Sequence, residues 1–210
     1  MEDSASHNLQ PLCFDAFAVG YSPATKTPIW AAQRLNRGEL DSARGVRRPD
    51  AGEGNADPFF ADPRLPSRWQ AGPRDFRGFD RGHLAPAGDQ PNAGAMAQSF
   101  SLANIVPQDS TMNRQAWAKV EADTRRYVRR AKGAVFVVTG AVFASPPARL
   151  PSGVAIPSHL FKAVLDETSG RSWAFLMPND ATAVVQPPIS LQELRARTGV
   201  QAFAGLGQPN

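Results

Sequence analysis

Residues 112–144, MNRQAWAKVEADTRRYVRRAKGAVFVVTGAVFA, decide the fold class. Four residues recur at the spacing of one helix face, namely Trp117, Val120, Thr124 and Val128. Basic residues crowd the last turns before Gly133, so the pattern predicts a helix over 112–132. Residues 134–144 are rich in β-branched and aromatic side chains, which is typical of a buried strand. A long helix among patterns that are mostly strands predicts an α+β fold.

Shorter patterns on both sides of this stretch predict the rest of a sheet. Residues 14–21 alternate apolar and small or polar positions, and a turn separates them from 29–32, which predicts a β-hairpin. Two more strands are expected at 159–165 and 172–177, and a short helix at 191–198. We therefore expect a central antiparallel β-sheet with flanking helices.

The length of 210 residues fits one domain with a hydrophobic core. We expect residues 1–12 to form a flexible N-terminal tail and residues 13–207 to form a single domain. Residues 36–78 are rich in Arg, Asp, Pro and Gly with little periodicity, which is typical of a functional or disordered loop. No apolar run approaches the roughly 20 residues of a membrane helix, so no membrane partner is expected.

The composition excludes some classes of site. Lysine and arginine total 23 against 19 acidic residues, which favours a polyanionic partner only mildly, because a net charge of +4 is common on solvated surfaces. One cysteine, Cys13, and three histidines exclude zinc fingers and ribbons. A three-histidine zinc site is not expected, since it would need His7 from the tail. A single histidine must then perform any acid–base chemistry.

His83 is the main candidate for this chemistry. It follows Asp80, Arg81 and Gly82 in the segment FDRGHLAPA at 79–87. An unperturbed histidine pKa of about 6.5 makes the imidazole a usable base at neutral pH. On these residues alone, a histidine packed under a loop for stability is an equally good interpretation.

A second group of candidates lies on the predicted helix. Asn113, Trp117 and Glu121 are spaced four apart and should lie along one side of the helix, with the first and last roughly 12 Å apart along its axis. At that separation both can serve one ion only if one acts through water. Oxygen ligands with retained water suit magnesium. Taken alone, an asparagine near a helix start and a solvated glutamate are the simpler interpretation.

Three blocks combine these candidates in order: FDRGHLAPA at 79–87, SFSLANIVPQ at 99–108 and NRQAWAKVE at 113–121. Together they resemble the DNA/RNA non-specific endonucleases of the ββα-metal (His-Me) finger class, and weaker similarity extends from about Cys13 to about Phe203. The resemblance implies a ββα-metal finger at the active site, made of the segment bearing His83, a crossing segment and the start of the long helix.

The resemblance also implies roles for the candidates. His83 would be the general base that activates water, Asn113 the direct ligand of a hydrated Mg²⁺ ion, and Glu121 a water-mediated partner of that ion and a catalytic residue. Mn²⁺ is an alternative metal. Arg81 and Asn104 would lie close to the scissile phosphate.

Basic residues in the blocks and further along the predicted helix should contact the nucleic acid. Arg81, Arg114 and Arg125 are the expected backbone contacts, although a solvated helix face explains most helix arginines equally well. Members of the family also use an arginine upstream of the finger to stabilise the transition state. Here Asn55 stands where a basic residue is expected, so Arg48, or Arg47, is the candidate replacement.

We therefore expect a magnesium-dependent endonuclease that hydrolyses single- and double-stranded DNA and RNA to 5′-phosphate products. The expected partners are DNA and RNA, with a protein inhibitor as a further candidate, and the protein should be a monomer or homodimer. The family and the basic composition favour a secreted or periplasmic protein, although the first residues do not match a signal peptide. A catalytically impaired nucleic-acid-binding protein and a small-nucleotide phosphodiesterase are the alternatives.

Overall fold

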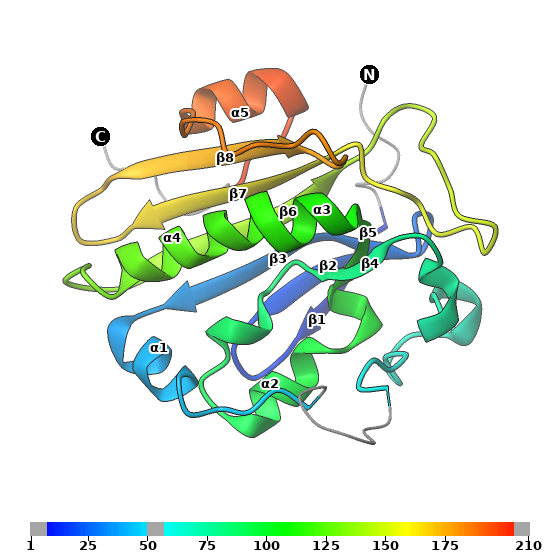
Figure 1. The fold of residues 1–210 in the computed structure, drawn as a ribbon, viewed down its shortest axis with the longest axis horizontal. Coiled ribbons are helices and arrows are strands. Elements are labelled where there is room, and N and C mark those ends of the chain that lie inside the picture. The colour runs from blue at the N-terminus through cyan, green and yellow to red at the C-terminus, as the bar shows by residue number, and fades with distance from the viewer. Residues whose placement is uncertain (1–7, 50–56, 204–210) are drawn as a thin grey trace.

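The computed structural model describes residues 8–49 and 57–203. Six strands form one sheet in the order β1-β2-β3-β6-β7-β8, and every neighbouring pair is antiparallel (Figure 1). The strands are β1 (Gln10–Cys13), β2 (Ala18–Ser22), β3 (Thr27–Leu35), β6 (Val135–Val142), β7 (His159–Asp166) and β8 (Ser172–Pro178). The expected antiparallel sheet, its hairpin β2–β3 and the three later strands are confirmed.

The sheet begins earlier in the chain than predicted. Gln10 pairs with Tyr21 and Cys13 pairs with Ala18, so residues 10–12 belong to an edge strand and not to a tail. Leu12 is buried in the main core, which explains why this strand is held in place. The first seven residues of the expected tail lie outside the described part of the chain.

The helices confirm some expectations and correct others. Those described are α1 (Arg37–Ala43), α2 (Ala93–Ser99), α3 (Ser110–Met112), α4 (Ala118–Val128) and α5 (Leu191–Thr198). A π-helical turn at Asn113–Trp117 joins α3 to α4, so the predicted long helix is present but spans residues 110–128. The short helix expected at 191–198 is confirmed.

The region 36–78 is more ordered than its composition indicates. Helix α1 begins with a capping box, in which the Asn36 side chain accepts from the Glu39 backbone N–H and the Glu39 carboxylate accepts from the Asn36 N–H. Leu40 and Ala43 are buried, so the helix belongs to the core. The expectation of a functional or disordered loop was therefore wrong for residues 37–43.

The two faces of the sheet are covered by different helices. On β7, Leu160 and Val164 pack in the clusters that contain residues of α4, whereas Phe161 and Ala163 pack with Leu194 of α5. Side chains alternate between the faces of a strand, so α4 and α5 lie on opposite sides of the sheet. Figure 1 shows α4 lying in front of the sheet, in roughly the same direction as its strands, and α5 beside β8.

A second, two-stranded ribbon packs in the same core cluster as α4. Its strands β4 (Asp80–His83) and β5 (Ile105–Gln108) are antiparallel, and helix α3 follows directly, which confirms the expected ββα finger. Gly82 is needed here for space, because a Cβ atom at this position would lie 2.0 Å from the buried Gln108 side chain. This packing fixes β4 against β5 and holds His83 at the end of the ribbon.

Candidate active site

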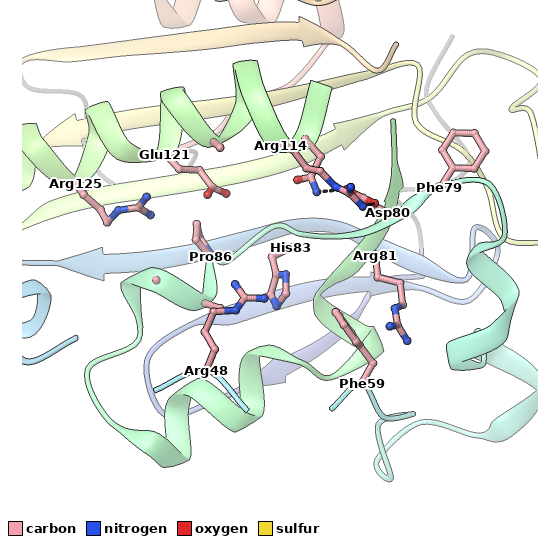
Figure 2. Close-up of a pocket in the computed structure, with 14 residues that line it drawn as sticks. Arg48, Phe59, Phe79, Asp80, Arg81, His83, Pro86, Arg114, Glu121 and Arg125 are labelled. Atoms are coloured by element: carbon pink, nitrogen blue, oxygen red, sulfur yellow. Dashed lines mark hydrogen bonds and ion pairs between the residues drawn. The ribbon is translucent and has the colours of Figure 1, made fainter. Parts of the chain in front are cut away.

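The finger and α4 enclose a cleft of about 600 Å³ (Figure 2). Three separate segments contribute to it: the loop before the finger, strand β4 with the turn after it, and one side of the long helix. The lining residues are Arg48, Phe59, Phe79, Asp80, Arg81, His83, Pro86, Ala87, Gly88, Asn113, Arg114, Ala118, Glu121 and Arg125. The structure therefore brings His83, Asn113 and Glu121 together in one cleft.

His83 is held between two aromatic rings. Its imidazole centre lies 5.6 Å from the ring centre of Phe59 and 4.9 Å from that of Phe100. The guanidinium of Arg81 lies 3.9 Å from the centre of the Phe59 ring, and that of Arg48 lies 5.3 Å from the centre of the Phe100 ring. Contacts on two sides restrict rotation of the imidazole, as positioning of a general base requires.

Asn113 is oriented by Asp80. The Asn113 Nδ2 donates to the Asp80 carboxylate over 2.9 Å, so the Asn113 amide oxygen lies on the opposite side of the group. Arg114 also donates to this carboxylate, from Nε and Nη2 over 2.9 and 2.7 Å. Burial would raise the pKa of Asp80, but the hydrogen bonds from Arg114 and Asn113 outweigh it and hold the pKa below the usual range. No role for Asp80 was predicted, although the residue lies in the segment 79–87 with His83.

Glu121 faces the same cleft from α4. Burial of its carboxyl group raises its pKa to about 7, although Lys162, Arg125 and Arg48 act in the other direction. Among the described residues, no three His, Cys, Asp or Glu side chains converge to hold an ion. An amide oxygen and one carboxylate fit magnesium, which prefers oxygen ligands and retains water. Asn113 would hold such an ion directly, and Glu121 would hold it through water.

The four-residue spacing predicted that Trp117 lies on the same side of the helix as Asn113 and Glu121, but it does not. It is 1% exposed and packs in the core between α4 and the sheet. Residues 113–117 form a π turn, so a spacing of four does not place Asn113 and Trp117 on one face. The four-residue step from Trp117 to Glu121 is α-helical and joins a buried residue to one that lines the cleft. The prediction of a shared face was therefore wrong for Trp117, whereas Asn113 and Glu121 both line the cleft.

Asn104 does not line the cleft, and its expected place near the phosphate is wrong. The residue is 0% exposed, and its side chain makes three hydrogen bonds to backbone. Its Oδ1 accepts from the Ala85 N–H, and its Nδ2 donates to the Ala85 and Ser99 carbonyls, each over 2.9 Å. Asn104 therefore anchors the chain immediately after His83 and is a positioning residue.

Three arginines that line the cleft, Arg81, Arg114 and Arg125, are paired with carboxylates. Arg81 pairs with Asp57 over 2.6 Å, Arg114 with Asp80 over 2.7 Å, and Arg125 with the buried Asp89 over 2.9 Å. These pairs fix the guanidinium groups and offset part of their charge.

Arg48 is the fourth arginine, and it reaches the cleft from the loop after α1. It contacts the same Phe100 ring as His83, and Figure 2 draws the two side chains beside one another. Of the two upstream candidates, Arg48 lines the cleft and Arg47 does not. Asn55, where the departure from the family pattern was noted, lies outside the described residues.

Lys162 is a charged residue of this region that the sequence interpretation missed. It stands on β7 with 1% exposure, and its ammonium group donates to the Thr139 hydroxyl and lies 5.5 Å from the Trp117 ring centre. Burial lowers the pKa of Lys162, whereas the carboxylates of Glu121 and Asp89 raise it. A lysine inside an otherwise apolar strand was the available signal, because a buried charge needs a partner.

The order of ribbon and helix, with His83 and Asn113 lining one cleft, agrees with the order of the blocks in the sequence. A model of the DNA/RNA non-specific endonuclease family matches residues 2–208. The chain belongs to this family.

Individual relatives of this family member are nucleases by name. Mitochondrial nuclease EXOG of Homo sapiens is 30% identical over 92% of this chain and 57% of its own length. Nuclease C1 of Cunninghamella echinulata var. echinulata is 29% identical over 90% of this chain and 81% of its own length. The chain thus spans little more than half of the EXOG relatives.

The fold is similar to that of a solved nuclease. A crystal structure of the EndoG/EndoGI complex, described as showing the mechanism of EndoG inhibition, matches with a TM-score of 0.77 and 22% identity. The match covers 95% of this chain and 86% of that one. Several relatives are named mitochondrial, which gives no support to the secreted or periplasmic location expected from the sequence. No helix in the described ranges is long and apolar enough to cross a membrane.

Proposed function

We propose that this protein is a magnesium-dependent nuclease that cuts DNA and RNA internally, without selecting the sugar. The observation that carries the proposal is the meeting of His83, Asn113 and Glu121 in one cleft lined by four arginines. A base, an oxygen ligand with a second oxygen group that can hold a hydrated cation through water, and phosphate-binding groups together suit hydrolysis of a phosphodiester.

His83 would take the proton from the attacking water. The bond between phosphorus and the 3′ oxygen then breaks, which leaves a 3′-hydroxyl on the upstream fragment and a 5′-phosphate on the downstream fragment. A magnesium ion at Asn113 and Glu121 would stabilise the negative charge on the phosphate and on the leaving oxygen. Because water is the nucleophile and the ribose 2′-hydroxyl takes no part, the same residues serve DNA and RNA.

Arg48 would replace the upstream arginine of the family. Its guanidinium lies on the same ring as the His83 imidazole, so it is placed to bind a phosphate oxygen while His83 acts on water. Arg81, Arg114 and Arg125 would contact the neighbouring phosphates. Contacts to phosphate do not depend on the base sequence, which is consistent with non-specific cutting.

Cleavage of supercoiled plasmid and of structured RNA, with magnesium or with a chelator, tests the proposal. We expect both substrates to be cut with magnesium, and their fragments to accept ligation because they carry 5′-phosphates. His83→Ala should lower kcat by a factor of about 10² to 10⁴, the usual contribution of a general base. Wild-type protein and His83→Ala leaving both substrates equally intact would disprove the catalytic role.

A gel-shift assay on the same samples separates the alternative, a nucleic-acid-binding protein that has lost turnover. Binding without cleavage in magnesium would favour that alternative. Faster turnover of a dinucleotide than of long DNA would instead favour a small-nucleotide phosphodiesterase.

A protein inhibitor that covers the cleft is a further proposal. It is supported by the likeness of the fold to EndoG in a complex with EndoGI. Inhibition of plasmid cleavage by an added candidate protein would test it, and gel filtration would distinguish monomer from homodimer.

A further inference from the structure

The helix that bears Asn113 and Glu121 contains one irregular turn. Between α3 and α4, the Ala118 N–H donates to the Asn113 carbonyl, five residues earlier. A ring of this size takes in one residue more than the ring of an α-helix. Such π turns occur mostly as single insertions and are frequent at functional sites.

The side of the helix that faces the cleft changes its spacing at this turn. Ala118, Glu121 and Arg125 line the cleft at intervals of three and four residues, as an α-helix requires, but Asn113 precedes Ala118 by five. Five residues of α-helix rotate by about 500°, so Asn113 would point about 140° away from Ala118. With one residue taken up by the π turn, the difference falls to about 40°.

The buried side of the helix changes its spacing at the same turn. Met112 and Trp117 are also five residues apart, yet both are fully buried in one core cluster with Val120. The residues that the turn places outside are exposed, among them Gln115. The cleft-facing side and the buried side of the helix therefore both require that the π turn takes up one extra residue.

We propose that the π turn sets the register between Asn113 and Glu121, so that both side chains face the same cleft, where the amide oxygen would bind a cation directly and the carboxylate would bind it through water. The proposal deepens the proposed function and rests on it for the identity of the cation. Asn113 is also held by the Asp80 carboxylate, to which the adjacent Arg114 donates as well.

One-residue changes within the turn test this register. Deletion of Gln115 should let residues 110–128 close into a regular α-helix, with both faces kept in place. Insertion of one alanine after Gln115 adds a residue that the turn cannot take up, so the N-terminal part must rotate by about 100°. In a regular helix, by contrast, deletion and insertion would be equally damaging.

We would measure Mn²⁺ binding by calorimetry and thermal unfolding by circular dichroism. We expect the deletion variant to bind Mn²⁺ within about threefold of wild type, and the insertion and Asn113→Ala variants to bind at least about 10-fold more weakly. Gln115→Ala is the matched control, because it removes the side chain without removing the residue. The deletion should also leave the Tm close to that of wild type.

A deletion variant that fails to fold, or that loses Mn²⁺ as the insertion does, would overturn the proposed register, and so would a harmless insertion. Failure of wild type itself to bind Mn²⁺ or cut nucleic acid would instead count against the proposed function. The Tm comparison would still test the register of Met112 and Trp117, because their burial needs no metal.

Discussion

Replacing Asp80 by alanine should weaken metal binding more than it weakens the fold. The carboxylate accepts from Asn113 Nδ2 over 2.9 Å and from two nitrogens of Arg114. The Arg114 side chain is 72% exposed, so solvent screens its ion pair and little stability is lost with it. The bond from Asn113 ends on a charged group that is mostly buried, and such bonds contribute about 1.5–3 kcal/mol.

The loss of this bond frees the Asn113 amide to rotate. Partners that orient a metal ligand typically affect metal affinity by about 10- to 100-fold, and we expect Asp80→Ala to fall in this range. Arg114→Gln is the matched control, because it removes the ion pair and keeps the bond between Asp80 and Asn113. It should remain within about threefold of wild type, in keeping with a solvent-screened pair.

Calorimetric titration of Mn²⁺ into wild type, Asp80→Ala, Asp80→Asn and Arg114→Gln measures these differences. Asp80→Asn should be intermediate, since its amide oxygen still accepts from Asn113 without the charge. Unchanged affinity in Asp80→Ala, in a protein whose Asn113→Ala variant no longer binds, would show that the amide is held by something else. Equal losses in Asp80→Ala and Arg114→Gln would assign the effect to the exposed ion pair.

Three further predictions concern stability. Asn104→Ala leaves three buried backbone groups without their partner and should lower the free energy of unfolding by about 2–4 kcal/mol in urea titrations; a smaller change than about 1 kcal/mol would contradict its anchoring role. Burial would raise the pKa of Asp62, but bonds from Arg64 and Ser101 lower it overall. Its stabilising contribution should thus be complete above the unfolded pKa of about 3.9 and disappear as pH falls through its lower folded pKa, and Asp62→Asn should remove this part of the pH dependence of Tm. Leu194→Ala, on the face of the sheet away from the cleft, should lower the free energy of unfolding by about 2–5 kcal/mol with cleavage rates at 25 °C unchanged.

The sheet was predictable because its strands carry their own signal. Residues 134–144 are mostly apolar and rich in β-branched side chains, so this strand could be predicted without knowledge of the rest of the fold. Helix α1 was missed because it has seven residues and only two of them are buried. Its capping box, Asn36 with Glu39, was nevertheless visible in the sequence.

The site was predictable to the extent that resemblance to a family could supply it. Motif spacing selected His83, Asn113 and Glu121, and all three line the cleft. The placement of Asn104 and Trp117 failed for physical reasons. Nothing in a sequence tells whether an asparagine points into a cleft or bonds to buried backbone, and a four-residue spacing indicates one face only while the helix is regular.

The charges beneath the cleft explain how a carboxyl group remains useful in a partly buried position. Burial raises the pKa of Glu121 to about 7 and lowers the pKa of Lys162, so burial disfavours the charged form of each group. The charge of each group in turn favours the charged form of the other. The Trp117 ring and the Thr139 hydroxyl also stabilise the Lys162 ammonium group. The π turn keeps Trp117 on this buried side while Asn113 faces the cleft. One helix therefore presents the oxygen atoms that suit a cation and covers the buried charge that opposes protonation of Glu121.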